Sequence, residues 1–216
     1  MNQPSGLIAR LRGDWPFPAG KSPVFYGWII AGISTLGFLF SVPGQTMGMA
    51  VFDDAFFEVT GLSRTELSLA YMLGTITSAF FLTRAGRWFD VHGARIVLIA
   101  ASLMLGMSIL FLSLVDRASD YLATVIGING SIIAFSLMVV GYFGVRFSGQ
   151  GVMTSASRNM LLLWFERRRG LVSGVSGVFV SLGFSLAPLL LAMLIDDWQW
   201  RAALGWLAVI VGPVFA

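Results

Sequence analysis

Arg146 is the residue whose type and position most clearly indicate chemistry in this 216-residue sequence. It lies inside an apolar stretch long enough to cross a membrane, where an arginine costs roughly 3 kcal/mol on insertion scales and normally faces a cavity or a partner. Helical spacing places four further residues on its face: Gln150, Met153, Thr154 and Ser157. The sequence therefore predicts a polar cavity wall containing Arg146 and Gln150. A structural arginine that only bonds backbone carbonyls is the alternative.

Two further pairs of polar residues interrupt apolar stretches at a spacing of four. Ser41 and Gln45 share one helix face, and Tyr71 and Thr75 share another. We include all four as candidates for the wall of the same cavity. Packing or hydrogen bonding between helices is the more ordinary use of such side chains, and it stays open as the alternative.

The composition is typical of a protein that lies in a membrane. Apolar residues make up 56% of the chain and charged residues 12%, against about 25% charged residues in a soluble domain. A span needs about 20 mostly apolar residues. Continuous runs of that length form helices, because barrel strands are about 10 residues long and alternate in polarity. We therefore expect an all-α integral membrane protein. With no Cys and one His in the chain, we expect no metal site.

Most Lys and Arg residues gather in three clusters that alternate along the chain with acidic gaps. The basic clusters are Arg10, Arg12 and Lys21; Arg84, Arg87 and Arg95; and Arg167, Arg168 and Arg169. Because basic residues favour the cytoplasmic side, we expect these clusters inside and the N-terminus cytoplasmic, in the plasma or inner membrane. The clusters flank spans and form no single basic face, so we expect no nucleic-acid partner.

The alternation of charges divides the chain into a tail and six spans. We expect a cytoplasmic tail at 1–23 and a six-helix transmembrane bundle over 24–216. The predicted spans are 24–51 with a kink at Pro43, 67–83, 96–115, 137–164, 171–195 and one that starts near 200 after a short turn at 196–199. As a helix the last span covers only about 22 Å, so we expect it to be cut short.

The apolar stretch 121–165 is about twice as long as one span. Two crossings here would put the basic cluster that begins at Arg167 on the outside, so we assign one crossing. Residues 121–135 are then an outside helix, a re-entrant piece or an extension of the third span. The sequence leaves these three possibilities open.

The predicted inside loop carries a spaced set of small and charged residues: Gly86, Asp90, Gly93 and Arg95. This spacing resembles the loop signature of the major facilitator superfamily, although Val and Ala stand at two positions where that family usually has basic residues. Gly86 would let a helix end pack closely, and Gly93 would allow a tight turn. Asp90 would face a helix N-terminus or pair with Arg87 or Arg95. An ordinary basic loop is the alternative.

The fourth predicted span adds a second match to the superfamily. In this span Arg146, Gly149, Gln150 and Gly151 resemble the fourth-span pattern of the superfamily, in which an arginine is followed by Gly, Gln and Gly. Three segments look like the branch that contains monocarboxylate porters and oxalate–formate exchangers: 26–28, 62–67 and 164–174. The resemblance covers nearly the whole chain from residue 26.

The fifth predicted span contains small residues at intervals. Gly174, Gly183 and Pro188 partly resemble the antiporter motif of the superfamily. Small residues also let helices approach closely in lipid, and we take plain helix packing as the better interpretation.

Members of this superfamily have twelve spans in two halves, with a substrate site between the halves near the midplane. The resemblance implies the N-terminal half of a secondary active transporter that moves a small solute, expected to be a small organic anion, by alternating access. Expected partners are the bilayer, the substrate, a proton or an exchanged anion, and the missing C-terminal half or a second copy of this chain. No cofactor is expected, and no nucleophile–base pair suggests an enzyme.

Two other interpretations stay open. A natural six-span protein could pair with its own copy, because some transporter halves are parallel repeats about an axis along the membrane normal. A non-transporting scaffold or receptor would need nothing from Arg146 or from the loop.

Overall fold

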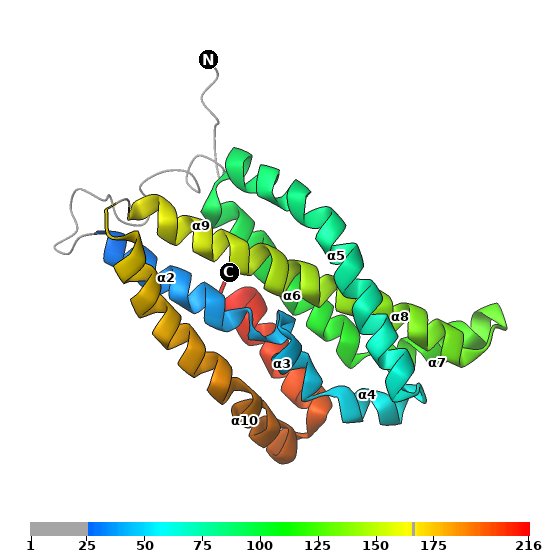
Figure 1. Ribbon diagram of the computed structural model, residues 1–216. Helices are drawn as coiled ribbons and strands as arrows, with labels where there is room; N and C mark the ends of the chain where they lie inside the picture. Colours follow the sequence, from blue (N-terminus) through cyan, green and yellow to red (C-terminus); the bar gives the residue numbers. More distant parts are fainter. Residues whose placement is uncertain (1–25, 166) are drawn as a thin grey trace.

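The computed structural model describes residues 26–165 and 167–216, and every regular element in that part of the chain is a helix. This confirms the predicted all-α class. The predicted tail at 1–23 lies outside the described residues. The helices run alongside one another as a bundle, and successive rods reverse direction (Figure 1).

The elements combine into six rods within the described part of the chain. They are α2 (Tyr26–Phe40), η2 (Val42–Gly44), α3 (Thr46–Ala50), α4 (Asp53–Thr60), α5 (Arg64–His92), α6 (Ala94–Ser113), α7 (Val115–Ile126), α8 (Gly130–Val145), η3 (Arg146–Met153), α9 (Thr154–Trp164), α10 (Arg169–Val209) and η4 (Ile210–Val214). The rods are α2–α3, α5, α6–α7, α8–η3–α9 and the two arms of α10, the second arm continuing into η4.

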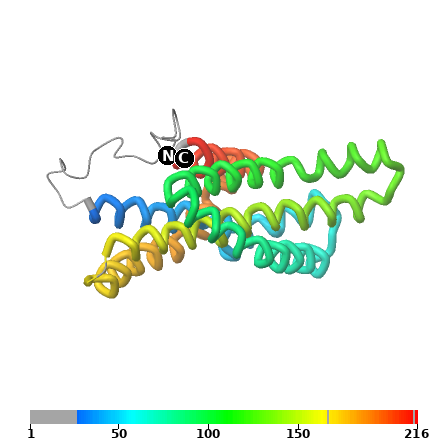
Figure 2. Tube along the Cα trace, turned by 90° about the horizontal axis from the view of Figure 1, so that it is seen from above, coloured from blue at the N-terminus to red at the C-terminus, as the bar shows by residue number. Residues whose placement is uncertain are grey.

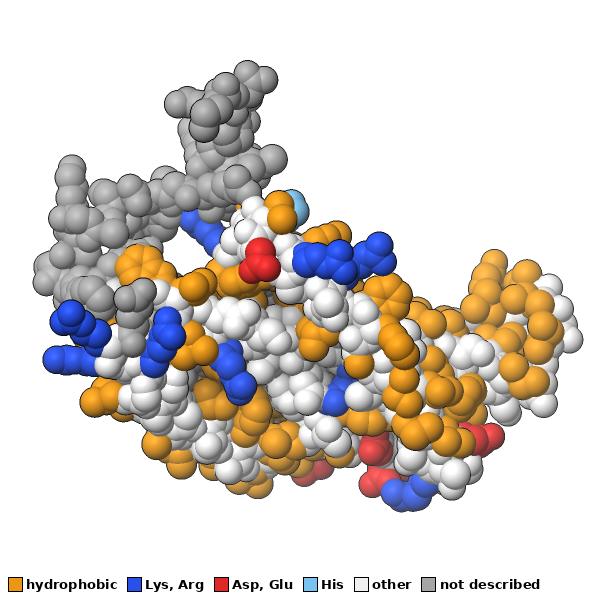
Figure 3. Space-filling view, turned by 45° about the horizontal axis from the view of Figure 1, so that its top comes forward, with side chains coloured by type: hydrophobic (Ala, Val, Ile, Leu, Met, Phe, Trp, Pro, Cys, Tyr) orange, Lys and Arg blue, Asp and Glu red, His pale blue; other side chains and the backbone are white. Residues whose placement is uncertain are grey.

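Four helical stretches are long and apolar enough to cross a membrane, and α2 is a shorter apolar helix. The four are Arg64–His92, Ala94–Ser113, Gly130–Trp164 and Arg169–Pro213. The last contains a reversal, because Gln199 has φ 65° and ψ 152° inside α10. It therefore supplies two rods, with the turn at the end of the predicted segment 196–199. Figure 3 shows broad hydrophobic surface on the outside of the bundle, as lipid contact requires.

Pro43 interrupts the first span, as predicted. The chain leaves the α-helical path after α2, forms the 3-10 turn η2 around Pro43, and resumes as α3. Proline has no backbone N–H and clashes with the preceding turn, so a regular helix cannot continue through it. The break leaves the carbonyl of Gly44 without a helical partner, which matters for the site below.

The predicted inside loop at 84–95 is wrong in its extent. Helix α5 continues through these charged residues to His92, and the chain turns only at Gly93. Ser63 and Glu66 form a capping box that begins the helix, and no Gly or Pro in a breaking position ends it before Gly93. Gly93 has φ 82°, a conformation that favours glycine, so the predicted role of Gly93 in the turn is confirmed.

Residues 121–135 form the closed end of a helical hairpin, which contains the turn between α7 and α8. Helix α6 ends at Ser113, α7 runs from Val115 to Ile126, and α8 begins at Gly130 with Asn129 as its N-cap. The two helices lie side by side and extend beyond their neighbours (Figures 1 and 2). Residues 121–126 therefore belong to an additional helix that continues the third rod, and the fourth rod starts about two turns earlier than predicted. The single crossing up to Trp164 agrees with the structure.

Close helix crossings depend on pairs of small residues. A Cβ on Gly106 of α6 would lie 2.9 Å from the Cα of Gly212, and a Cβ on Gly44 would lie 2.6 Å from the Cα of Gly149. Such contacts let backbones approach and gain dispersion energy where lipid supplies no hydrophobic driving force. The first crossing joins the third and sixth rods, and the second joins the first and fourth.

In the fifth rod, which is the first arm of α10, only some of the predicted small residues make close helix contacts. Gly183 lies directly against Leu39 of α2, but a Cβ on Gly174 would meet nothing within 4 Å among the described residues. The structure therefore gives the packing prediction no support at Gly174. Pro188 lies within α10 without interrupting it and is half-buried.

Candidate functional site

Arg146 is the centre of a buried polar cluster that joins three elements. Its side chain is only 8% exposed. Its Nε donates a hydrogen bond to Oγ1 of Thr75 on α5, at 3.1 Å, and a terminal nitrogen donates to the carbonyl of Gly44 on η2, at 3.2 Å. The guanidinium carbon also lies 5.1 Å from the ring centre of Tyr71, within the range of a cation–π contact.

Local backbone geometry explains why Arg146 finds these partners. The break at Pro43 frees the Gly44 carbonyl, because no later N–H of the same helix reaches it. Arg146 is the first residue of η3, which is wound as a π-helix. Such widened turns are rare and are frequently found at functional sites. The close approach of Gly44 and Gly149 brings the free carbonyl within reach of the guanidinium.

Tyr71 and Thr75 complete the cluster from α5, where they lie on one face of the helix as their spacing predicted. Thr75 donates its hydroxyl to the carbonyl of Tyr71 at 2.8 Å while accepting from Arg146. The Tyr71 hydroxyl donates to Thr46 at 2.9 Å. The ring of Tyr71 meets that of Tyr142 edge to face, with 5.1 Å between ring centres. Three of the six predicted cavity residues, Arg146, Tyr71 and Thr75, are thus in mutual contact.

Ser41 and Gln45 form a separate buried cluster with Thr154. The Gln45 amide donates to Ser41 at 3.2 Å and to Thr154 at 3.3 Å, and Thr154 donates to Ser41 at 3.2 Å. These bonds hold the first rod against the fourth, which is the hydrogen-bonding alternative left open above. Gln45 also lies one residue from Gly44, so the two clusters share the same break in the first span.

Gln150 is exposed, and the predicted polar stripe along the fourth span is not continuous. The α-helical spacing used for that prediction fails inside η3, because a π-helix has more residues in each turn. Met153, predicted on the face of Arg146, is fully buried, and Ser157 is buried against Gly37 of α2. A π-helix leaves no hydropathy signal, so the sequence could not show this change of face.

A cavity of about 340 Å³ opens beside the ring of Tyr71. It lies between the first span, α4, α5 and α8, and its lining includes Asp53, Arg64, Tyr71 and Tyr142. Burial and the neighbouring Asp54 raise the pKa of Asp53 above its usual value, against the lowering effects of a hydrogen bond with Tyr142 and of Arg64. The cavity adjoins the Arg146 cluster at Tyr71, carries the ionisable residues Asp53 and Arg64 on its wall, and is called the vestibule below. Asp53 and Tyr142 were not among the predicted site residues.

The comparison with protein families decides what kind of protein this is. The model described as Major Facilitator Superfamily matches residues 29–216. The chain belongs to the major facilitator superfamily. Separate comparisons with curated proteins and with solved structures find no match. Members of the superfamily are membrane transporters that contact the bilayer and a small-molecule substrate. The expected branch of monocarboxylate porters and oxalate–formate exchangers gains no support from the match.

The superfamily loop signature lies on the last turns of α5 and on the turn after it. Asp90 is exposed and lines a shallow groove with Gly93 and Trp164 at the end of α9. A Cβ on Gly86 would meet nothing within 4 Å among the described residues, so the structure gives no support for a close helix contact there. Arg95 is half-buried, and its pairing with Asp90 stays a prediction.

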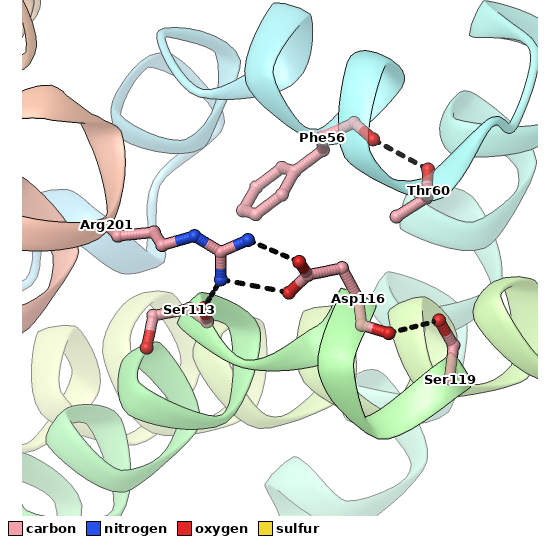
Figure 4. Close-up of polar contacts among 6 residues, drawn as sticks. All are labelled: Phe56, Thr60, Ser113, Asp116, Ser119 and Arg201. Carbon is pink, nitrogen blue, oxygen red and sulfur yellow. Dashed lines mark hydrogen bonds and ion pairs between the residues drawn. The ribbon is translucent and has the colours of Figure 1, made fainter. Parts of the chain in front are cut away.

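An ion pair at the other end of the bundle was not predicted. Both terminal nitrogens of Arg201, near the start of the sixth rod, donate to the carboxylate of Asp116 on α7, and one also donates to the carbonyl of Ser113 at 3.0 Å (Figure 4). Burial raises the pKa of Asp116, but the hydrogen bonds and charge of Arg201 outweigh it and hold the pKa below its usual value. This pair fastens the sixth rod to the junction of α6 and α7. Its members are 85 residues apart, and no local pattern connects them.

In the part of the chain that the structure describes, no three His, Asp or Glu side chains come together in a way that could hold a metal ion.

Proposed function

We propose that this protein is half of a secondary active transporter that moves a small organic anion across the cell membrane by alternating access, with its N-terminus in the cytoplasm. The substrate would lie between this bundle and a second six-helix half, near the midplane of the membrane. The second half would be either a C-terminal partner in a longer polypeptide or a second copy of this chain.

The observation that carries this proposal is the unbalanced charge of Arg146. The side chain is buried, and its contacts among the described residues are a hydroxyl, a backbone carbonyl and an aromatic ring. Neither of the ion pairs found in the described chain includes it. A guanidinium has five N–H donors, and the bonds to Thr75 and Gly44 use two of them. A carboxylate could take others in a bidentate geometry and balance the charge.

The vestibule beside Tyr71 supports a route to this arginine. Tyr71 lines the vestibule and also contacts Arg146. A small rotation of α5 against α8 would separate Tyr71 from Tyr142 and connect the vestibule to the guanidinium. The coupled species in this proposal is a proton or an exchanged anion.

Replacement of Arg146 tests the proposal. The complete transporter is reconstituted in proteoliposomes, and counterflow is measured with a panel of labelled small mono- and dicarboxylates. We expect Arg146→Ala to abolish uptake and Arg146→Lys to retain a weak fraction of it, because lysine keeps the charge without the fork of donors. Arg158→Ala is the matched control, since Arg158 is exposed on the same rod. Normal flux in Arg146→Ala would reject the assignment.

A measurement on the native protein decides between the two forms of the second half. The intact mass of the native polypeptide is measured after extraction from its membrane. A species near 23.4 kDa that forms crosslinked dimers supports a second copy, and a species of about twice that mass supports a C-terminal half. A monomeric 23.4 kDa species without flux in vesicles would instead indicate a scaffold or receptor.

A further inference from the structure

We propose that a groove formed by α5, α6 and η3 is a binding site for an anionic phospholipid. One acyl chain would lie along its apolar wall, and the phosphate would bind at Arg84 and His92. This inference rests on the membrane location of the helices and is independent of the substrate proposed above.

The groove has the size and lining of a site for a hydrocarbon chain. Its volume is about 470 Å³, and three elements supply its walls. The lining residues are Phe81, Arg84, Ala85, Trp88, His92, Ile96, Val97, Ala100, Ala101, Met104, Phe147, Ser148 and Val152. Along α6 the wall extends from Ile96 to Met104, which is about 12 Å at the rise of an α-helix. The ionisable residues in this lining are one arginine and one histidine, and no acidic residue belongs to it.

Polarity changes along the groove as it does along a phospholipid. Arg84, Trp88 and His92 follow at intervals of four on α5, so they lie on one face at the end of the helix that carries the basic residues. Trp88 is 64% exposed, which is typical of a side chain at the level of lipid head groups. Farther along, the wall is made by Phe81, Ala100 and Met104.

The charge of the rim favours an anionic lipid over a zwitterionic one. Arg84 is exposed and forms no ion pair among those of the described residues. The nearest acidic residue in the sequence, Asp90, lines a different groove, between the turn at Gly93 and α9. Arginine near a bilayer surface gains about 1 kcal/mol from anionic lipid, and a phosphate at the rim would meet no opposing carboxylate from the groove wall.

The floor of the groove connects a bound lipid to the arginine cluster. Phe147, Ser148 and Val152 belong to η3, the π-helical segment that begins with Arg146. Ser148 and Val152 are already buried, and Phe147 is half-buried. An acyl chain in the groove would cover the rest of Phe147, while Arg146 at the start of η3 bonds to Gly44. Bound lipid is therefore expected to stabilise the bundle.

The test measures retained lipid and thermal stability in the complete transporter. Purified protein is incubated with phosphatidylglycerol or phosphatidylcholine in mixed micelles, and bound lipid is counted by native mass spectrometry. We expect one tightly held phosphatidylglycerol, weaker retention of phosphatidylcholine, and a higher Tm with the anionic lipid. Arg84→Gln should weaken phosphatidylglycerol retention about fivefold. Ala100→Trp should block it by filling the groove.

Two matched variants control for the loss of a charge and for the addition of a tryptophan outside the groove. Arg87→Gln removes a neighbouring charge that is not in the groove, and Leu103→Trp adds a tryptophan to α6 outside the groove; both should retain the lipid normally. Equal retention of the two lipids by the unsubstituted protein would overturn the proposal. Unchanged phosphatidylglycerol retention in both Arg84→Gln and Ala100→Trp would also overturn it, and would indicate a groove covered by another protein segment.

Discussion

Gly44 and Gly149 face each other where the first and fourth rods cross, so closely that a Cβ on Gly44 would lie 2.6 Å from the Cα of Gly149. At the same crossing the Gly44 carbonyl accepts a hydrogen bond from Arg146. The position of the buried guanidinium therefore depends on two residues without side chains. A close backbone contact and a polar bond at one point make the crossing a rigid support for the proposed anion site.

We predict that Gly149→Ala destabilises the bundle. The added methyl group must displace the backbone of the first rod, because the nearest atoms are the main chain of Gly44 and a side chain of α6. Overpacking of this kind costs about 1–3 kcal/mol, and Tm in detergent should fall. Gly174→Ala is the control, since a Cβ there meets nothing within 4 Å among the described residues. Equal Tm values for the two variants would contradict the importance of the crossing.

We predict that Thr75→Val weakens transport without preventing folding. Valine keeps the shape of threonine but removes the oxygen that accepts from Nε of Arg146. A hydrogen bond to a charged group contributes about 1.5–3 kcal/mol to the folded structure. Its loss would release the guanidinium from its fixed position, so KM for the anion should rise. Thr77→Val is the matched control, because Thr77 is exposed and its hydroxyl donates to the carbonyl of Leu73 one turn earlier on the same helix. A similar KM in both variants would remove Thr75 from the site.

The parts of the site that the sequence predicted are those that depend on regular helical spacing. Tyr71 and Thr75 lie on one face of an ordinary α-helix, and the structure places both against Arg146. The predicted continuous stripe from Arg146 through Gln150 was wrong, because Arg146 is buried while Gln150 is exposed. The chain is π-helical from Arg146 to Met153, and the apolar pattern carries no trace of this. The predicted end of the second span was also wrong, because α5 continues through Arg84 and Arg87 to His92, so charged residues do not mark a loop there.

Contacts between distant segments were beyond sequence reasoning. Asp116 and Arg201 are oppositely charged, but many arrangements of six helices would leave them apart. Only the packing of the sixth rod against α6, through Gly106 and Gly212, brings them together. The ion pair therefore depends on the close contact between Gly106 and Gly212, and that contact is known only from the three-dimensional structure.

We predict that the ion pair between Asp116 and Arg201 stabilises the bundle in a pH-dependent way. The pKa of Asp116 is lowered in the folded protein, so its contribution is present above the usual value of 3.8 and is lost as pH falls through the folded pKa. Asp116→Asn should lower Tm at pH 7 and make Tm less sensitive to acid. A double-mutant cycle with Arg201→Met measures the coupling, which we expect to be about 1–3 kcal/mol. Additive effects would mean that the two side chains do not stabilise each other.

We predict the opposite pH dependence for Asp53. Burial and the neighbouring Asp54 raise its pKa in the folded state, so the folded protein binds a proton more readily than the unfolded chain. The resulting stabilisation is complete below the usual pKa of 3.8 and is lost as pH rises through the folded pKa. Asp53→Asn, which is uncharged at every pH, should therefore raise Tm at pH 7 and remove this part of the pH dependence.

Asp54→Asn separates this effect from a general change of surface charge. Asp54 pairs with Arg64 at 2.8 Å, and both side chains are largely exposed, so the loss of this pair should change Tm little. The measurement is Tm between pH 7 and pH 4 for the unsubstituted protein and both variants. If Asp53→Asn follows the unsubstituted protein over this range, the buried environment beside Tyr142 does not control the proton affinity of Asp53. If the Tm curves of Asp53→Asn and the unsubstituted protein converge toward pH 4 and separate at pH 7, ionisation of Asp53 in the vestibule destabilises the folded protein, as its raised pKa predicts.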